Sequence, residues 1–161
     1  GQKMVVATLF CDIRGSSQLA ETLTPHDLVM TLNEHFTAMT EIVFRHEGTL
    51  DKYIGDEIMA VFGAPFKIGN EAYRAVATAL EMQQKTAELN VIRAQESRPV
   101  IHIGVGIDLG EAIAGYIGSP RRMDFTVVGD RVNTAKRFCD LAAYGRPCRA
   151  TSWAVLWARS S

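Results

Sequence analysis

The 161-residue sequence predicts an α+β domain in which helices pack on a mostly antiparallel sheet. Segments with helical periodicity alternate with short apolar runs that are typical of buried strands. One pair of runs, over residues 48–65, is separated by only a tight turn, which joins antiparallel strands and not parallel ones. No repeat, low-complexity segment or linker interrupts this order. We therefore expect a single domain over residues 1–161.

Composition indicates an ordinary globular domain. Hydrophobic residues make up 47% of the chain, and 17 basic and 18 acidic residues leave a net charge of −1. Because these charges balance, we expect no nucleic-acid partner and no contact with a membrane surface. Three cysteines without CxxC spacing (Cys11, Cys139 and Cys148) indicate reduced thiols in the cytoplasm and argue against a structural zinc site. The first residue is Gly1, so we expect a domain excised from a larger protein.

The first half of the chain predicts a strand, a short helix, a long helix and a hairpin. The apolar run 4–10, "MVVATLF", is typical of a strand buried on both faces. Thr24 and the Pro25 that follows it signal the start of the long helix, which Gly48 ends. The hairpin that follows turns at Gly55-Asp56.

The second half predicts a helix, further strands and a last helix. Asn70 is placed to cap a helix that runs to about Asn90. Residues 98–118 predict two strands with a turn near Leu109–Glu111, and a short strand follows over 125–128. The last helix has an apolar face made of Val132, Ala135, Cys139 and Ala142.

Two isolated carboxylates, Asp12 and Asp56, break the apolar pattern at the end of the first strand and at the hairpin turn. Singly, Asp56 could be a turn former and Asp12 a cap for the short helix. If the first strand and the hairpin are neighbours, the two carboxylates meet at one edge and favour a cation between them. Carboxylates and the Ile13 carbonyl are oxygen ligands that suit Mg²⁺, which often shares its other positions with phosphates. The pair therefore predicts a nucleotide-phosphate site, with a two-metal arrangement as one form.

A second polar pair lies in the last helix. Asn133 and Arg137 are four residues apart and so project from one helix face. A solvated surface is the ordinary interpretation of such a pair. The buried face is already taken by the apolar residues, so the pair lies on the adjoining flank. There an amide and a guanidinium could contact a ribose and a phosphate.

Three segments together resemble the signature segments of the class III nucleotidyl cyclases in order and spacing: "LFCDIRG", "GTLDKYIGDEIMAVFGAP" and "FTVVGDRVNTAKR". The resemblance covers Met4 to about Ala143. It implies a ferredoxin-like α+β fold and a head-to-tail homodimer with active sites at the interface. It also implies conversion of a nucleoside triphosphate to a 3′,5′-cyclic monophosphate and pyrophosphate, with two Mg²⁺ or Mn²⁺ ions per site.

The resemblance also assigns roles to individual residues. It implies metal binding by Asp12, Asp56 and the Ile13 carbonyl, base recognition by Lys52 and Thr126, ribose orientation by Asn133, and transition-state stabilisation by Arg137. Members of the family continue into a further hairpin with a basic residue that grips the β- and γ-phosphates. No residue here matches it, so we expect the domain to be truncated at this hairpin.

The base-reading pair favours ATP. Lys52 only donates hydrogen bonds, whereas the Thr126 hydroxyl can accept them. A donor for N1 and an acceptor for the 6-amino group fit adenine, while guanine offers the reverse pattern. We therefore predict an adenylate cyclase, with a guanylate cyclase and a non-catalytic dimerising signalling module as alternatives. The Lys–Thr pair also resembles the class IIIb branch, several members of which respond to bicarbonate, so bicarbonate is a candidate regulator.

Overall fold

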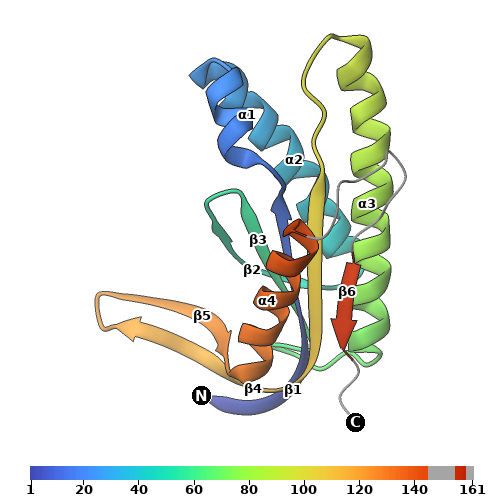
Figure 1. Cartoon of the computed structure of the whole chain (residues 1–161). Helices are drawn as coiled ribbons and strands as arrows, with labels where there is room; N and C mark the ends of the chain where they lie inside the picture. The colour runs from blue at the N-terminus through green and yellow to red at the C-terminus, as the bar shows by residue number, and fades with distance from the viewer. Residues whose placement is uncertain (145–154, 159–161) are drawn as a thin grey trace.

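The computed structural model describes residues 1–144 and the backbone of 155–158, so that Cys148 and most of the C-terminal tail lie outside the described residues. The elements follow the predicted order (Figure 1). They are β1 (Gln2–Ile13), α1 (Ser16–Thr22), α2 (Pro25–Arg45), β2 (Thr49–Ile54), β3 (Glu57–Phe62), α3 (Glu71–Gln95), β4 (Ile103–Ser119), β5 (Arg122–Val128), α4 (Asp130–Tyr144) and β6 (Val155–Ala158).

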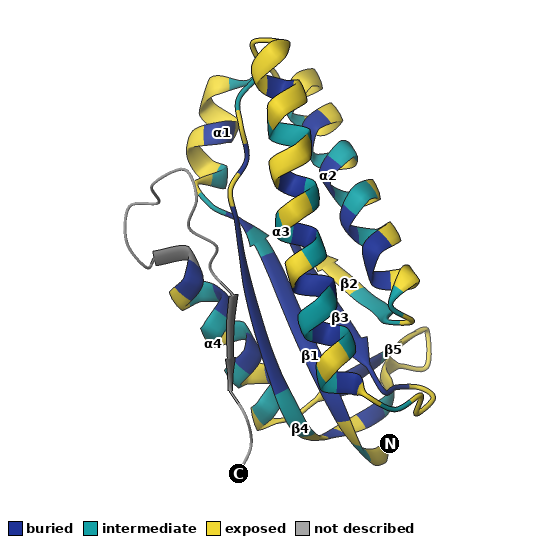
Figure 2. Ribbon diagram, turned by 90° about the vertical axis from the view of Figure 1, so that its right-hand side faces the viewer, coloured by how far each residue is buried: buried dark blue, intermediate teal, exposed yellow. Residues whose placement is uncertain are grey.

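The strands form one sheet in the order β2-β3-β1-β4-β5, in which all neighbouring pairs are antiparallel. The short strand β6 adds a parallel pair on β4. Helices α2 and α3 cover one face of the sheet and α4 covers the other (Figures 1 and 2). The predicted α+β class with a mainly antiparallel sheet is confirmed. A doubly wound parallel sheet, as in a phosphoacceptor receiver domain, is excluded.

Strand β1 lies at the centre of the sheet and is buried on both faces (Figure 2). Ala7, Leu9 and Cys11 pack beneath α2 and α3, whereas Val6 and Phe10 pack beneath α4. Side chains alternate between the two faces of a strand, and both faces of β1 are covered. This explains why the sequence there is a continuous apolar run and not an alternating one.

The starts predicted for α2 and α3 are confirmed, but the predicted side-chain cap of α3 is wrong. The Thr24 hydroxyl accepts a hydrogen bond from the Asp27 backbone N–H at 3.2 Å, as predicted. Asn70 does precede α3, but it has a left-handed backbone and makes no side-chain cap. The Glu71 carboxylate instead accepts a hydrogen bond from the Gly69 N–H at 3.1 Å. Helix α3 also extends beyond Asn90, to Gln95.

The predicted turn near Leu109–Glu111 is wrong. Residues 103–119 form a single strand, β4, and the chain reverses only between Ser119 and Arg122. The reason is the length of β1, which pairs with β4 without interruption from Gln2↔Ala114 to Ile13↔Ile103. Within this ladder Gly110 lies opposite Val6, so a local turn signal is overridden by continuous pairing.

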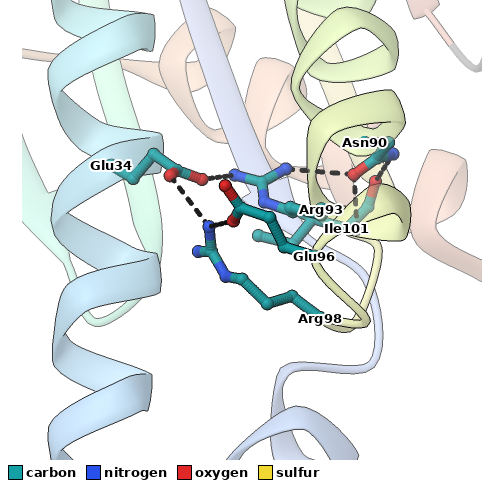
Figure 3. Close-up of polar contacts among 6 residues, drawn as sticks. All are labelled: Glu34, Asn90, Arg93, Glu96, Arg98 and Ile101. Atoms are coloured by element: carbon teal, nitrogen blue, oxygen red, sulfur yellow. Dashed lines mark hydrogen bonds and ion pairs between the residues drawn. The ribbon is translucent and has the colours of Figure 1, made fainter.

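A buried arginine ties the two long helices to the segment that leads into β4 (Figure 3). Arg93 of α3 is 1% exposed and lies 2.7 Å from the Glu34 carboxylate of α2. Arg98 contacts the same carboxylate at 3.3 Å. The Asn90 side chain bonds both the N–H and the carbonyl of Ile101, at 2.9 and 2.6 Å. A buried charge is tolerated only when paired in this way, and here the pairing fixes the entry to β4.

We predict that His35 makes the domain less stable at acidic pH. This α2 residue is 1% exposed, and burial, with the charge of Arg93, lowers the pKa of His35 to about 4. Between pH 4 and 6.5 the unfolded chain binds more protons than the folded one, so stability is fully present above 6.5 and falls as pH falls. Relative to a His35→Leu variant, the wild type should lose about 2 kcal/mol of unfolding free energy between pH 7.5 and pH 5. Urea denaturation at the two pH values measures this, and equal losses in both proteins would contradict it.

Candidate functional site

Asp12 and Asp56, the two carboxylates singled out in the sequence, are brought together by the pairing of β1 with β3. Cys11 pairs with Ile58, so the end of β1 lies beside the β2–β3 turn. The Asp56 carboxylate accepts a hydrogen bond from the Ile13 backbone N–H at 3.3 Å. The turn itself requires Gly55, whose φ of 61° lies in the left-handed region. The predicted neighbourhood of the two aspartates and Ile13 is thus present within one chain.

Strand geometry also brings a second group of ligand atoms to Asp12. The face of β1 that carries Val6 and Phe10 also carries Asp12, two residues further on. On the same face, Glu57 of β3 and Cys139 of α4 offer ligand atoms that all lie within 4.8 Å of one another and of Asp12. Glu57 is 6% exposed at its side chain and pairs with Lys136 at 2.9 Å. Sequence reasoning missed Glu57, although a charged residue at the start of an apolar strand was a visible signal.

The electrostatics around Asp12 favour a bound cation. Burial, together with the charges of Glu57 and Asp56, raises the pKa of Asp12 to about 6. Its Oδ1 atom is buried and has no hydrogen-bond partner among the described residues. An unpaired buried acceptor beside two other carboxylates is costly, and a divalent cation would remove that cost. The residues present therefore fit a metal ion.

Two ligand sets share Asp12, and their chemistry differs. Burial and the charge of Asp12 raise the pKa of Cys139 above its ordinary value, which keeps the thiol protonated. A protonated thiol is a poor ligand, and Glu57 is already engaged by Lys136. Asp12 and Asp56 offer hard oxygen atoms, as Mg²⁺ and Mn²⁺ prefer, and Asp56 is held only by the weaker hydrogen bond from the Ile13 N–H among the contacts described above. We therefore expect the aspartate pair to be the better metal site.

A hollow of about 530 Å³ opens beside Asp12. It is lined by the segment 12–18, which joins β1 to α1, and by Asp140 of α4. Gly15 in this segment has a φ of 66°, which lets the backbone turn sharply around the hollow. The lining is mainly polar, so the space suits a hydrated or charged ligand more than an apolar one.

Lys52 and Thr126, the predicted base-reading residues, both contact Asp51. The Thr126 hydroxyl donates a hydrogen bond to the Asp51 carboxylate at 2.7 Å, and the Lys52 ammonium lies 3.5 Å from the same carboxylate. Sequence reasoning missed Asp51. Its signal was weak, because an acidic residue beside a lysine on a strand usually indicates a solvated surface.

Asn133 and Arg137 lie on the exposed flank of α4, while Val132, Ala135 and Cys139 are buried as predicted. Within the described part of the chain, neither polar side chain has a hydrogen-bond or ion-pair partner. Among residues 1–144, no hydrogen bond or ion pair joins them to the aspartates. One chain thus presents an aspartate group and, apart from it, a pair of exposed polar side chains on α4.

Comparison with known proteins gives a consistent result over nearly the whole chain. Residues 2–146 match the family model described as the adenylate and guanylate cyclase catalytic domain. An uncharacterized protein of Mycobacterium tuberculosis is 36% identical over 142 residues, which cover 88% of this chain and 24% of that protein. The chain therefore spans about a quarter of the length of the curated relatives that it matches.

Two solved structures illustrate the structural similarity. The guanylyl cyclase Cya2 has a TM-score of 0.82 and 33% identity, with 91% of this chain and 81% of that chain covered. The adenylyl cyclase CyaB from P. aeruginosa has a TM-score of 0.78 and the same 33% identity, with 86% and 72% covered. Overall similarity therefore does not distinguish an adenylyl cyclase from a guanylyl cyclase. None of the described helices is long and apolar enough to cross a membrane.

We predict that the aspartate pair, and not the Glu57–Cys139 group, holds divalent metal. Asp12→Asn and Asp56→Asn should each weaken Mn²⁺ binding about tenfold or more, because each removes a charged oxygen ligand. Glu57→Gln is the matched control and should retain most of the affinity. Titration calorimetry measures the affinities, with melting temperatures to confirm folding. The opposite ranking, with Glu57→Gln the most damaging change, would place the metal in the other group.

Proposed function

The chain belongs to the family of adenylate and guanylate cyclase catalytic domains, and we propose that it is an adenylate cyclase that converts ATP to 3′,5′-cyclic AMP and pyrophosphate. The observation that carries this proposal is a full set of competent side chains in the segments that resemble the family. Asp12 and Asp56 supply two carboxylates at one strand edge. Asn133 and Arg137 supply exposed polar groups on α4 that have no partner in the part of the chain that the structure describes.

The active form that we propose is a head-to-tail homodimer. The exposed Asn133 and Arg137 find no partner among the described residues of their own chain, which supports a role towards a ligand held by a second copy. In this arrangement Asp12 and Asp56 of one protomer face Lys52, Thr126, Asn133 and Arg137 of the other. A two-fold axis then creates two identical sites, because each protomer contributes both groups once.

Asp12, Asp56 and the Ile13 carbonyl would hold Mg²⁺ or Mn²⁺, two ions per site in the form that the family resemblance implies. When bound there, divalent metal would supply a lower pKa for the ribose 3′-hydroxyl and positive charge for the departing pyrophosphate. The hollow lined by residues 12–18 gives the triphosphate space beside these carboxylates. The metal site and the phosphate site are then contiguous.

The remaining residues position the reacting atoms. The 3′-oxygen attacks the α-phosphorus in line, the bond from that phosphorus to the pyrophosphate oxygen breaks with pyrophosphate as the leaving group, and the hydroxyl proton passes to solvent water. Asn133 orients the ribose through its amide, and Arg137 stabilises negative charge on the α-phosphate oxygens through its planar guanidinium. Positioning and electrostatics supply most of the rate, as in phosphoryl transfer generally.

A guanylate cyclase is the second candidate, and the similarity to Cya2 favours it as much as the similarity to CyaB favours the first. The residues favour ATP, since Lys52 offers a donor for adenine N1 and Thr126 an acceptor for the 6-amino group. We place the domain in the cytoplasm, in keeping with Cys11 and Cys139, which are free and buried. Bicarbonate remains a candidate regulator on the Lys–Thr resemblance alone.

The substrate assignment predicts a preference that kinetics can measure. With Mn²⁺ present, the protein should convert ATP with a kcat/KM about tenfold or more above that for GTP, because mismatched polar groups at the base are left unpaired. Separate assays of cyclic AMP and cyclic GMP, with and without bicarbonate, provide the measurement. An equal or higher value for GTP would identify a guanylate cyclase, and no product from either substrate would identify a non-catalytic relative.

The dimer assignment predicts recovery of activity on mixing. Asp56→Ala and Arg137→Ala should each be inactive alone, because every homodimer then has two defective sites. A mixed dimer retains one intact site, so an equimolar mixture should regain about a quarter of wild-type activity if protomers exchange freely. The mixture is assayed after dissociation and reassociation, with wild type treated in the same way as control. Failure to recover would show that both residues belong to a site within one chain.

A further inference from the structure

A buried carboxylate joins the two side chains that are proposed to read the base. The Asp51 side chain is 4% exposed. Its Oδ2 accepts the Thr126 hydroxyl proton at 2.7 Å, and its Oδ1 lies 3.5 Å from the Lys52 ammonium. Lys52 keeps 43% of its side chain exposed, whereas Thr126 is 7% exposed. Asp51 thus lies behind both residues, and Lys52 reaches outwards.

The fold makes a specific adjustment to reach this arrangement. In the β2–β3 ladder Leu50 pairs with Ala60 and Lys52 with Met59, so Asp51 is an extra residue outside the pairing. Such a bulge changes the direction of the side chains around it. Asp51 and Lys52 therefore need not point to opposite faces of the sheet, as consecutive residues of a regular strand do. Strands β2 and β5 are at opposite ends of the sheet order, and yet the Thr126–Asp51 bond connects them.

The hydrogen bond decides what the Thr126 hydroxyl can offer to a ligand. A hydroxyl has one proton and two lone pairs, so a free threonine can donate or accept. An ionised carboxylate only accepts, and therefore Thr126 must donate its single proton to Asp51. Only its lone pairs remain, which makes the hydroxyl an acceptor. Lys52 has three protons and no lone pair, so it can only donate to a ligand.

We propose that Asp51 is a positioning residue that sets base specificity by holding the Thr126 hydroxyl as an acceptor beside the Lys52 donor. The inference rests on the proposed function, in which this pair reads the purine of the substrate. An acceptor at Thr126 matches the 6-amino group of adenine and repels the 6-oxygen of guanine or hypoxanthine. Asp51 touches neither base. Without it, the threonine hydroxyl rotates and accommodates both.

A purely structural role for Asp51 makes a different prediction. If the Asp51–Thr126 bond served only to fasten β5 to β2, its loss would reduce turnover of ATP and of GTP by the same factor. A role in specificity changes the ratio of the two kcat/KM values. The ratio therefore distinguishes the two roles even when a variant is less active or less stable overall.

Asp51→Asn is the direct test in the full chain, with Thr126→Val as the matched comparison. The carboxamide is nearly isosteric but can donate to Thr126 as well as accept, so the hydroxyl proton becomes available for a 6-oxygen. We expect the ATP-to-GTP ratio of kcat/KM to fall about tenfold. Because Asp51 acts through Thr126, Asp51→Asn should change the ratio little further in a Thr126→Val background.

The outcomes separate this inference from the proposed function. If wild type forms no cyclic nucleotide, or prefers GTP, the proposed function fails and this inference fails with it. If wild type prefers ATP and Asp51→Asn leaves the ratio unchanged, only this inference is overturned. The same holds if Asp51→Asn and Thr126→Val change the ratio additively, because then Asp51 does not act through the hydroxyl.

A second measurement leaves Asp51 intact, in case its replacement prevents folding. Inosine triphosphate has a 6-oxygen, and purine riboside triphosphate has only hydrogen there. A hydroxyl fixed as an acceptor disfavours the 6-oxygen, so the inosine-to-purine ratio of kcat/KM should be lower in wild type than in Thr126→Val. Comparison with Thr126→Val cancels the contribution of Lys52 at N1. A higher ratio in wild type would show that the hydroxyl donates, and would overturn the inference.

Discussion

The antiparallel ladder between β1 and β4 is the constraint on which the other features of this domain depend. It runs without a break from Gln2↔Ala114 to Ile13↔Ile103. At one end it carries Asp12 to the edge where the β2–β3 turn supplies Asp56. At the other end β4 continues beyond β1 and pairs with β5, which carries Thr126. A single register therefore determines where the aspartates lie and where the strand that carries Thr126 begins.

The same ladder sets how closely α4 approaches the sheet. A Cβ atom on Gly106 of β4 would collide with the backbone of Ala135 and Cys139 in α4, so only glycine permits this packing. The close approach places Cys139 and Lys136 over Asp12 and Glu57. Burial of several acidic groups at one point opposes folding, as the raised pKa of Asp12 shows. The extensive apolar core on both sides of the sheet offsets that cost, a common compromise at functional sites.

Local patterns were sufficient to predict much of the fold and part of the site. The buried run of β1, the Thr24 cap, the hairpin at Gly55 and the apolar face of α4 each depend on neighbours within a few residues, and each is present. The continuous strand β4 could not be predicted, because Leu109–Glu111 has the composition of a turn and only pairing with β1 keeps it extended. The bond from Asp51 to Thr126 joins residues 75 positions apart, and no periodicity encodes such a contact.

That contact bears on why one fold can serve two substrates. Cya2 and CyaB are named for different activities and yet resemble this chain at the same 33% identity. The overall fold therefore does not determine which base is bound. The choice of base must depend on a few atoms in the site. Adenine and guanine differ there mainly in which atoms carry hydrogen, so a side chain that can both donate and accept discriminates poorly. Thr126 is such a side chain when free, but here its hydroxyl donates its one hydrogen bond to Asp51. On the proposed function, the bulge in β2 that brings Asp51 to this position contributes to recognition of the base, although Asp51 itself contacts no substrate.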